Sequence, residues 1–399
     1  MKGLITAIVP TFNRADYLIQ AVEALMSQSR PVDQIIIWDD GSSDHTAQVM
    51  AGLHAPRGTE LLCRTAANGG KSQALNAAMD LARGDYIWIC DDDDLVRPDA
   101  AQDLAHVLDT TDAGWVAGRH VRFHLDPGTQ RKVMTDTGYW PDLSQGSVLR
   151  HLLEDIFFFQ PGTLVRRSAY DAVGPFREDI SRSIDYEMFV RLGARFPVTV
   201  LDKIVFEQRK HEGARGAGSN RHSAAEAEAV WKSMDRAIFA DFRDVLPLSL
   251  YGGLFDGEDV RRAGLLQRGC VYARRADWET ALTDFEAALA LAPAAPLDAT
   301  ERAVVIRALA GKHGAAEAYG APFNARLLSL SRQGAAGASF VRALARGSVW
   351  RLRDAVQRRD WVAAGRIGRF MVAAGLPLGG PGETRLQERQ TLHPEAYAW

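Results

Sequence analysis

Four consecutive aspartates, Asp91–Asp94, follow the apolar run YIWIC. Four carboxylates at the end of a buried strand repel one another, and the usual relief in proteins is a hard divalent cation bound by oxygen atoms. Because side chains alternate along an extended backbone, we expect Asp91 and Asp93 to share the cation while Asp92 faces elsewhere. The alternative is a solvated acidic turn that caps the following helix, to which Asp94 would contribute.

A second acidic pair, Asp39 and Asp40, ends the apolar run in IIIWDDGSSDHT at residues 35–46. One interpretation is an ordinary strand-to-helix turn, in which Gly41 permits the tight turn and one of the polar residues 42–44 caps the next helix. This interpretation leaves open why two like charges stand side by side after a strand that favours burial. The other interpretation is that one of the two carboxylates binds a ligand.

The segments that would position these acids alternate between a strand-like and a helix-like pattern of apolar residues. Short β-branched runs predict strands at residues 4–10, 34–40 and 84–94. The segments ADYLIQAVEALMSQ and KSQALNAAMDLARG, which lie between the strands, carry apolar residues at helical spacing. This order predicts a parallel α/β sheet, in which ligands bind beyond the carboxyl ends of the strands. The loops PTFNR, DDGSSD and DDDD should therefore open on one crevice.

The rest of the chain divides into a mixed region and a helical one. Residues 115–210 predict further α/β structure with some antiparallel strands, and the glycine-rich segment 211–223 predicts a mobile loop suited to a lid. Alanine and arginine then dominate to the end with hardly a strand signal. We predict an α/β domain over residues 1–245 and an all-helical domain over residues 255–399. Within the latter, residues 265–293 resemble a tetratricopeptide hairpin, with a generic helical hairpin as the alternative.

Composition narrows the class of protein. The 399 residues carry a formal net charge of −3, which gives no basic field for nucleic acid. The three cysteines are far apart and form no CxxC pair, which argues against a zinc site and favours a reducing compartment. No signal peptide and no spanning helix is predicted, so we expect a cytoplasmic protein. Eight arginines between residues 342 and 369 are interleaved with apolar residues, which is compatible with peripheral binding to the inner face of an anionic membrane, or with packing in the fold.

Five segments together resemble the family 2 glycosyltransferases, which have the GT-A fold, across roughly residues 3 to 225. The segments occur in the usual order: AIVPTFNRADYLIQAVEALMSQ, IIIWDDGSSDHT, NGGKSQALNAAMDLARGDYIWICDDDD, GPFREDISRSIDYEMFVRLG and RKH. The resemblance implies an inverting transfer of a sugar from a nucleotide donor, usually a UDP-sugar. It also implies Mg²⁺ or Mn²⁺ as a cofactor on the diphosphate.

The resemblance assigns roles to several binding residues. The first nucleotide-binding loop is represented by Pro10, Thr11, Asn13 and Arg14. Asp40 corresponds to the residue that accepts a hydrogen bond from the N3–H of uracil, a task that suits a carboxylate. Lys71 occupies a position from which a basic residue approaches the base or the phosphates, with a solvated lysine at a helix start as the alternative.

The remaining assignments concern the metal and the base. Asp91–Asp93 match the DXD segment, in which Asp93 is the expected metal ligand and Asp92 lies closer to the ribose or the water shell. Asp185 lies where the family places the base that takes the acceptor's proton, although the usual acidic neighbour is Ile184 here; an N-cap role is the alternative and Glu187 the fallback base. His211 matches a histidine that approaches the metal or the diphosphate in some relatives.

The leading hypothesis is therefore a metal-dependent inverting glycosyltransferase, hexosyl- or N-acetylhexosaminyl-type, acting on a saccharide or lipid-linked acceptor. Such an enzyme would serve bacterial-type synthesis of cell-surface polysaccharides or glycoconjugates. The alternative is an inactive sugar-nucleotide-binding scaffold that acts through its helical domain. Retention of Asp40, Asp93 and Asp185 argues against that loss of activity.

Overall fold

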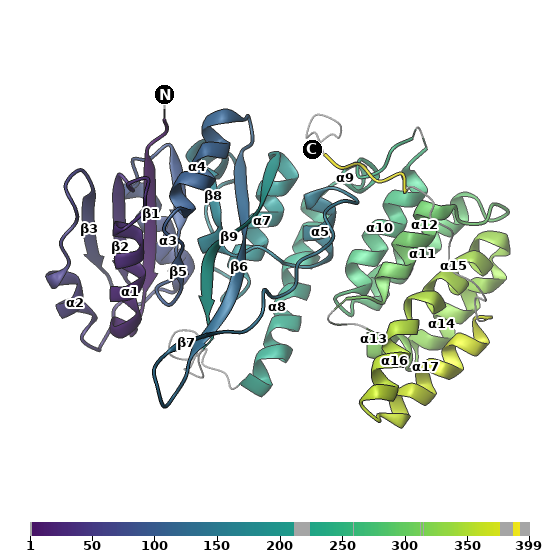
Figure 1. The fold of residues 1–399 in the computed structure, drawn as a ribbon. Helices are drawn as coiled ribbons and strands as arrows, with labels where there is room; N and C mark the ends of the chain where they lie inside the picture. The colour runs from purple at the N-terminus through teal and green to yellow at the C-terminus, as the bar shows by residue number, and fades with distance from the viewer. Residues whose placement is uncertain are drawn as a thin grey trace. The chain divides into compact units, whose positions relative to one another are not determined.

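The structure is a computed structural model in which two compact units are distinguished (Figure 1). The first comprises residues 1–141 and 157–228, and the second comprises residues 142–156 and 229–399. The residues described are 2–210, 224–257, 259–311, 313, 315–375 and 386–391, with only the backbone described for 224–229.

The first unit is built on a mixed sheet in the order β3-β2-β1-β4-β8-β6-β9-β5, with β7 paired to β6. Its N-terminal half is parallel and consists of β1 (Ile5–Thr11), β2 (Gln34–Asp39), β3 (Glu60–Thr65) and β4 (Tyr86–Ile89). Strands β1 and β4 are buried throughout, as continuous β-branched and aromatic runs predict for a sheet covered on both faces. The three predicted strands are confirmed, whereas β3 was missed because its residues are only half-buried.

The other half of the sheet is mostly antiparallel. It consists of β5 (Leu95–Val96), β6 (Trp115–Leu125), β7 (Lys132–Met134), β8 (Thr163–Arg166) and β9 (Val198–Arg209). Strand β8 runs antiparallel to β4 and β6, while β6 and β9 are parallel.

Helices cover the parallel strands on both faces. The helices of this unit are α1 (Ala15–Met26), α2 (Thr46–Gly52), α3 (Lys71–Leu81), α4 (Ala100–Thr110), α6 (Arg167–Val173) and α7 (Ile184–Arg195), with the short 3₁₀ turn η1 (Gln160–Gly162). Leu18 of α1 and Leu104 of α4 share one core cluster with Val9 and Ile37. Because strand side chains alternate, Ile8 points to the opposite face, where α3 packs on β1 and β2.

The second unit is helical. Its helices are α5 (Val148–Glu154), most of α8 (Ala224–Val245), α9 (Leu248–Gly252), α10 (Arg261–Ala273), α11 (Trp278–Leu291), α12 (Ala299–Ala308), α13 (Ala315–Ala318), α14 (Phe323–Ser329), α15 (Gly334–Gly347), α16 (Val349–Gln357) and α17 (Trp361–Ala373), with the 3₁₀ turn η3 (Leu330–Arg332). Helices α10 and α11 form the hairpin expected at residues 265–293. Gly269 is needed there, because a Cβ on it would come within 2.5 Å of the Phe285 ring.

The boundary between the units differs from the predicted break at residues 245–255. Helix α5 lies within the first half of the sequence, yet it belongs to the helical unit. The reason is Glu154, whose buried carboxylate accepts hydrogen bonds from Gln267 Nε2 at 3.0 Å and Arg307 Nε at 2.8 Å. Apolar periodicity predicts a buried helix face but does not say which core buries it. Among the described helices, none is both long enough and apolar enough to span a bilayer.

Candidate active site

The loops that follow β1 and β2 are joined by hydrogen bonds, as predicted for loops at one edge of a parallel sheet. The Oδ1 atom of Asn13 accepts hydrogen bonds from the backbone N–H groups of Ser43 at 2.7 Å and Asp44 at 3.3 Å. In return the backbone N–H of Asn13 donates to Ser42 Oγ at 2.8 Å. Asn13 has φ of 55°, a left-handed conformation that asparagine tolerates better than most residues. In this structure Asn13 is therefore a link between two loops.

Asp44 has the capping role that was predicted for residues 42–44, and it serves two helices. Its carboxylate accepts from the first amide of α1, Ala15 N–H, at 3.2 Å and from Thr46 N–H at the start of α2 at 3.0 Å. Partial burial acts to raise the pKa of Asp44, but hydrogen bonds from Thr46 outweigh it and lower the pKa. Asp39, the last residue of β2, stabilises the turn that follows, since its Oδ1 accepts from Ser42 N–H at 2.9 Å.

Asp40 is buried and is held by a third loop, which follows β3. Its Oδ1 accepts from Gly69 N–H at 2.8 Å, and its Oδ2 accepts from Gly70 N–H and Asn68 Nδ2, both at 2.9 Å. Asn68 Nδ2 also donates to the backbone oxygen of Asp40 at 2.8 Å. This role of Asn68 was not predicted from the sequence, although Asn-Gly-Gly is a turn signal.

Lys71 begins α3 directly after that loop and reaches the acidic segment. Its Nζ lies 2.5 Å from Asp91 Oδ1. Burial acts to lower the pKa of Lys71, but the carboxylates of Asp91, Asp185 and Asp93 outweigh it and raise the pKa. Lys71 is thus an exposed lysine at the start of α3, as the alternative interpretation expected, and its ammonium group is paired with Asp91.

Asp92 and Asp93 are bridged by the first loop. Arg14 Nη1 lies 2.9 Å from Asp92 Oδ1 and 2.6 Å from Asp93 Oδ2. The expectation that Asp92 faces away from Asp93 was wrong, because β4 ends at Ile89 and Asp92 and Asp93 form a turn in which strand alternation does not apply. Two side-chain cations, Arg14 and Lys71, thus relieve the repulsion within Asp91–Asp93.

Asp94 turns away from this cluster and is buried. Its Oδ1 accepts from the backbone N–H of Arg209 at 2.8 Å, so it does not cap α4. Burial raises the pKa of Asp94 well above its usual range, and Asp93 and Asp91 add to the effect. Burial also raises the pKa of Asp92 to about 6, against the opposing attraction of Arg14.

Arg209 forms hydrogen bonds with the acidic turn. Its side chain is buried. Its Nε donates to the backbone oxygen of Asp93 at 2.9 Å, and its guanidinium lies 4.9 Å from the Tyr17 ring centroid and 4.8 Å from that of Phe123. Arg209 therefore positions Asp93. His211, the predicted second metal residue, lies outside the described residues.

Asp185 lies in the first turn of α7, where its Oδ1 accepts from Tyr186 N–H at 2.9 Å. The N-cap position belongs to Ser183, so the alternative N-cap role does not apply. Burial raises the pKa of Asp185, Lys71 opposes this, and Asp91 adds to it. The fallback Glu187 is engaged elsewhere, with both carboxylate oxygens 2.7 Å from Arg191 nitrogens.

The carboxylates of the site fit a divalent cation that is also bound by substrate phosphates. No group of three or more His, Cys, Asp or Glu side chains that could hold a metal ion occurs among the described residues. Mg²⁺ usually binds proteins through one or two carboxylates together with substrate phosphates. Asp91 and Asp93 supply such carboxylates, and Arg14 and Lys71 supply cations that would face the phosphates.

Part of the chain is similar to a known protein family. Residues 6–174 match the family described as Glycosyl transferase family 2. The chain is 30% identical over 128 residues to glycosyltransferase GlyG of Streptococcus pneumoniae serotype 4, covering 32% of this chain and 42% of that protein. It is 26% identical over 210 residues to a chondroitin synthase of Pasteurella multocida, covering 52% of this chain and 21% of that protein. The chain spans less than half the length of these two relatives.

Among solved structures, S. aureus TarS 1–349 in complex with UDP-GlcNAc aligns with a TM-score of 0.49 and 16% identity. The alignment covers 93% of this chain and 90% of that chain. The family match covers the strands and loops that carry Asn13, Asp40, Lys71 and the acidic turn. The family match therefore covers most of the N-terminal α/β unit, and over residues 6–174 the chain is similar to glycosyl transferase family 2.

Proposed function

We propose that the protein is a metal-dependent inverting glycosyltransferase that moves a hexosyl or N-acetylhexosaminyl group from a UDP-sugar to a saccharide or lipid-linked acceptor. The observation that carries the proposal is the convergence of Asp91, Lys71 and Asp185. Lys71 is paired with Asp91 and is influenced by the charge of Asp185, which supports a base close to the phosphate site. The similarity to a chondroitin synthase supports a saccharide acceptor.

Asp185 would act as the general base. Direct displacement at the anomeric carbon requires a carboxylate that takes the proton of the acceptor hydroxyl as the new bond forms. The raised pKa of Asp185 makes its carboxylate a stronger base. The positive charge of Lys71 acts in the other direction and stabilises the ionised carboxylate. Glu187 does not compete for the role, because its carboxylate is held by Arg191.

Asp40 would read the base of the nucleotide. A carboxylate offers about four acceptor sites, and Asn68, Gly69 and Gly70 use three of those on Asp40. These hydrogen bonds fix the orientation of the carboxylate, which supports recognition of the single N3–H donor of uracil. Asn68 would thus position Asp40.

The diphosphate would lie against the acidic turn. Asp91 and Asp93 would hold a Mn²⁺ or Mg²⁺ ion, which supplies positive charge for the departing diphosphate. Arg14 and Lys71 would exchange their carboxylate partners for phosphate oxygens, since guanidinium and ammonium groups bind both. Asp92 stays close to Arg14 in this arrangement.

A thermal-shift screen of UDP-, GDP- and dTDP-sugars with Mn²⁺ tests the donor, because a ligand that binds the folded state raises the melting temperature. We expect stabilisation by UDP-sugars and release of UDP that stops on chelation with EDTA. Stabilisation without any turnover, for every donor and acceptor tried, would favour the inactive scaffold. Stabilisation by GDP-sugars alone would contradict the assignment of uracil to Asp40.

A further inference from the structure

The final helix of the helical unit, α17, exposes large apolar side chains. Its inward side is formed by Ala364, Ile367, Phe370 and Met371, which are buried. On the outward side Trp361 and Val362 are each 66% exposed and Val372 is 67% exposed. Large apolar side chains that gather on one exposed side of a helix indicate an interaction surface.

The same side of α17 is basic. Arg366 and Arg369 are exposed, and helical periodicity places them with Trp361, Val362 and Val372 on one side. We call these five residues the α17 face. The stretch from Trp361 to Gly375 contains no Asp or Glu. Within the described part of the chain, neither arginine forms an ion pair, so the charge of this face is not neutralised by the fold.

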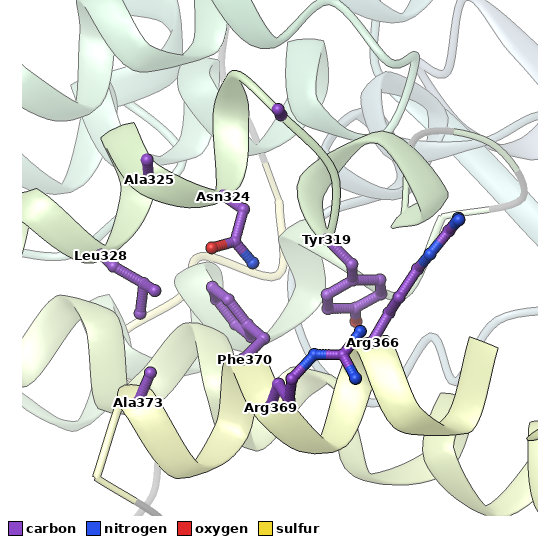
Figure 2. A pocket seen from close by; sticks show the side chains of 9 residues that line it. Tyr319, Asn324, Ala325, Leu328, Arg366, Arg369, Phe370 and Ala373 are labelled. Atoms are coloured by element: carbon purple, nitrogen blue, oxygen red, sulfur yellow. The ribbon is translucent and has the colours of Figure 1, made fainter. Parts of the chain in front are cut away.

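A hollow opens beside the two arginines. Its volume is about 390 Å³, and it lies between α14 and α17 (Figure 2). Arg366, Arg369 and Phe370 line it together with Tyr319 and Asn324. In Figure 2 both arginine side chains extend from α17 toward the side on which Tyr319 lies. Cationic groups at the rim of a partly apolar hollow suit an amphipathic ligand that carries an anionic group.

The neighbouring helix α16 also exposes apolar and basic side chains. Trp350 and Val356 of α16, which packs against α17, are 47% and 44% exposed. Arg353 and Arg359 are also exposed and have no carboxylate partner in the described chain. The apolar and basic character therefore belongs to adjacent parts of two helices and is not confined to one turn.

We propose that the α17 face binds the surface of an anionic lipid membrane. Trp361, Val362 and Val372 would enter the boundary between headgroups and acyl chains, where tryptophan is favoured. Arg366 and Arg369 would bind lipid phosphates at the rim of the hollow. A symmetric contact with a second copy is less favourable, because it places each arginine against the same cationic patch of its partner.

The first test is flotation of the full-length protein with vesicles of phosphatidylcholine that contain 30% phosphatidylglycerol. The variant Arg366→Glu/Arg369→Glu should bind on the order of 25-fold or more weakly, because each basic residue near an anionic surface contributes about fivefold. The matched control is Arg261→Glu/Arg332→Glu, which makes the same change in charge at two exposed residues outside α16 and α17. The control should bind like the wild type.

The second test separates insertion from charge alone. Trp361→Ser/Val362→Ser should release the protein from the same vesicles, whereas Val245→Ser/Leu291→Ser, at residues 55% and 46% exposed, should not. Vesicles of phosphatidylcholine alone should bind weakly, and the residual binding at 1 M salt should depend on Trp361.

Three results would overturn the proposal. Equal loss of binding in the charge-reversal variant and in its control would mean that only the net charge matters. Absence of wild-type binding to the anionic vesicles would exclude a lipid surface as the partner. A concentration-dependent dimer that Trp361→Ser/Val362→Ser abolishes would assign the α17 face to self-association. Circular dichroism of every variant establishes that the fold is retained.

Discussion

The guanidinium of Arg14 lies 2.6 Å from the carboxylate of Asp93, the residue that the sequence predicts as the metal ligand. The same nitrogen atom is 2.9 Å from Asp92. A cation of the first loop is thus held by the acids that would receive a divalent ion. Arg14 and the metal therefore compete for Asp93, unless a diphosphate draws the arginine away.

This competition predicts the effect of Arg14→Gln on metal affinity. Mn²⁺ titrated into the protein without nucleotide should bind on the order of tenfold more tightly to the variant, since a hydrogen bond to a charged group contributes about 1.5 kcal/mol. Isothermal titration calorimetry measures the affinity directly. Arg57→Gln, at an exposed arginine outside the site, is the control and should leave it unchanged. Equal Mn²⁺ affinity in all three proteins would show that Arg14 does not block the ion.

Asp185→Asn should lower the rate of transfer by about a thousandfold, within the usual range for loss of a general base. UDP affinity should remain nearly intact, because the proposed role of Asp185 concerns the acceptor. Single-turnover kinetics and UDP titration separate the two effects. Asp179→Asn is a suitable control, since Asp179 is exposed and pairs only with Arg177 among the described residues. A parallel loss of UDP binding would show that Asp185 holds the nucleotide.

The pH dependence of transfer follows from the raised pKa of Asp185. The base must be ionised to accept a proton, so the rate should fall as the pH drops through this pKa, above the usual range of an aspartate. The acid limb of kcat, measured with saturating donor and acceptor, reports this ionisation. An acid limb at or below the usual aspartate range would contradict the role assigned to Asp185.

Asp92 makes a separate prediction about stability. Its folded-state pKa is raised to about 6 by burial, so between its ordinary pKa and pH 6 the folded protein binds more protons than the unfolded chain. The contribution of Asp92 is therefore most favourable in acid and is lost as the pH rises through 6. Asp92→Asn removes this titration. Relative to the wild type, the free energy of unfolding of this variant should rise by on the order of 2 kcal/mol between pH 4 and pH 7. A constant difference in urea unfolding across that interval would contradict the assignment.

Asn68→Ala tests the loop that holds Asp40. The variant loses the side-chain donor to both the carboxylate and the backbone oxygen of Asp40. UDP should bind roughly tenfold more weakly, because one or two hydrogen bonds to a charged group contribute about 1.5 kcal/mol or more. The rate with saturating donor should change little. A lower rate at unchanged UDP affinity would mean that this loop serves the reaction and not the base of the nucleotide.

The sequence could predict which loops meet, because that depends only on strand order. The apolar runs at residues 4–10, 34–40 and 84–94 predicted parallel strands, and the carboxyl ends of β1, β2 and β4 do lie at one edge.

Side-chain partners within the site depended on geometry that periodicity does not contain. The turn at Asp92 and Asp93 directs both carboxylates to Arg14, whereas the assumption of a continuing strand separated them. The sequence also did not indicate that Arg209, the last residue of β9, is buried and donates to the backbone oxygen of Asp93. These errors arise from long-range packing, which one sequence does not record.

The most direct test of the central claim is the rate of UDP release from a UDP-sugar in the presence of acceptor. It should be measured with Mn²⁺ and with EDTA for the wild type, Asp93→Ala and Asp185→Asn. The account predicts Mn²⁺-dependent release by the wild type only, with UDP affinity retained in Asp185→Asn. Asp93→Ala that is still stimulated by Mn²⁺, or Asp185→Asn that transfers at the wild-type rate, would contradict it.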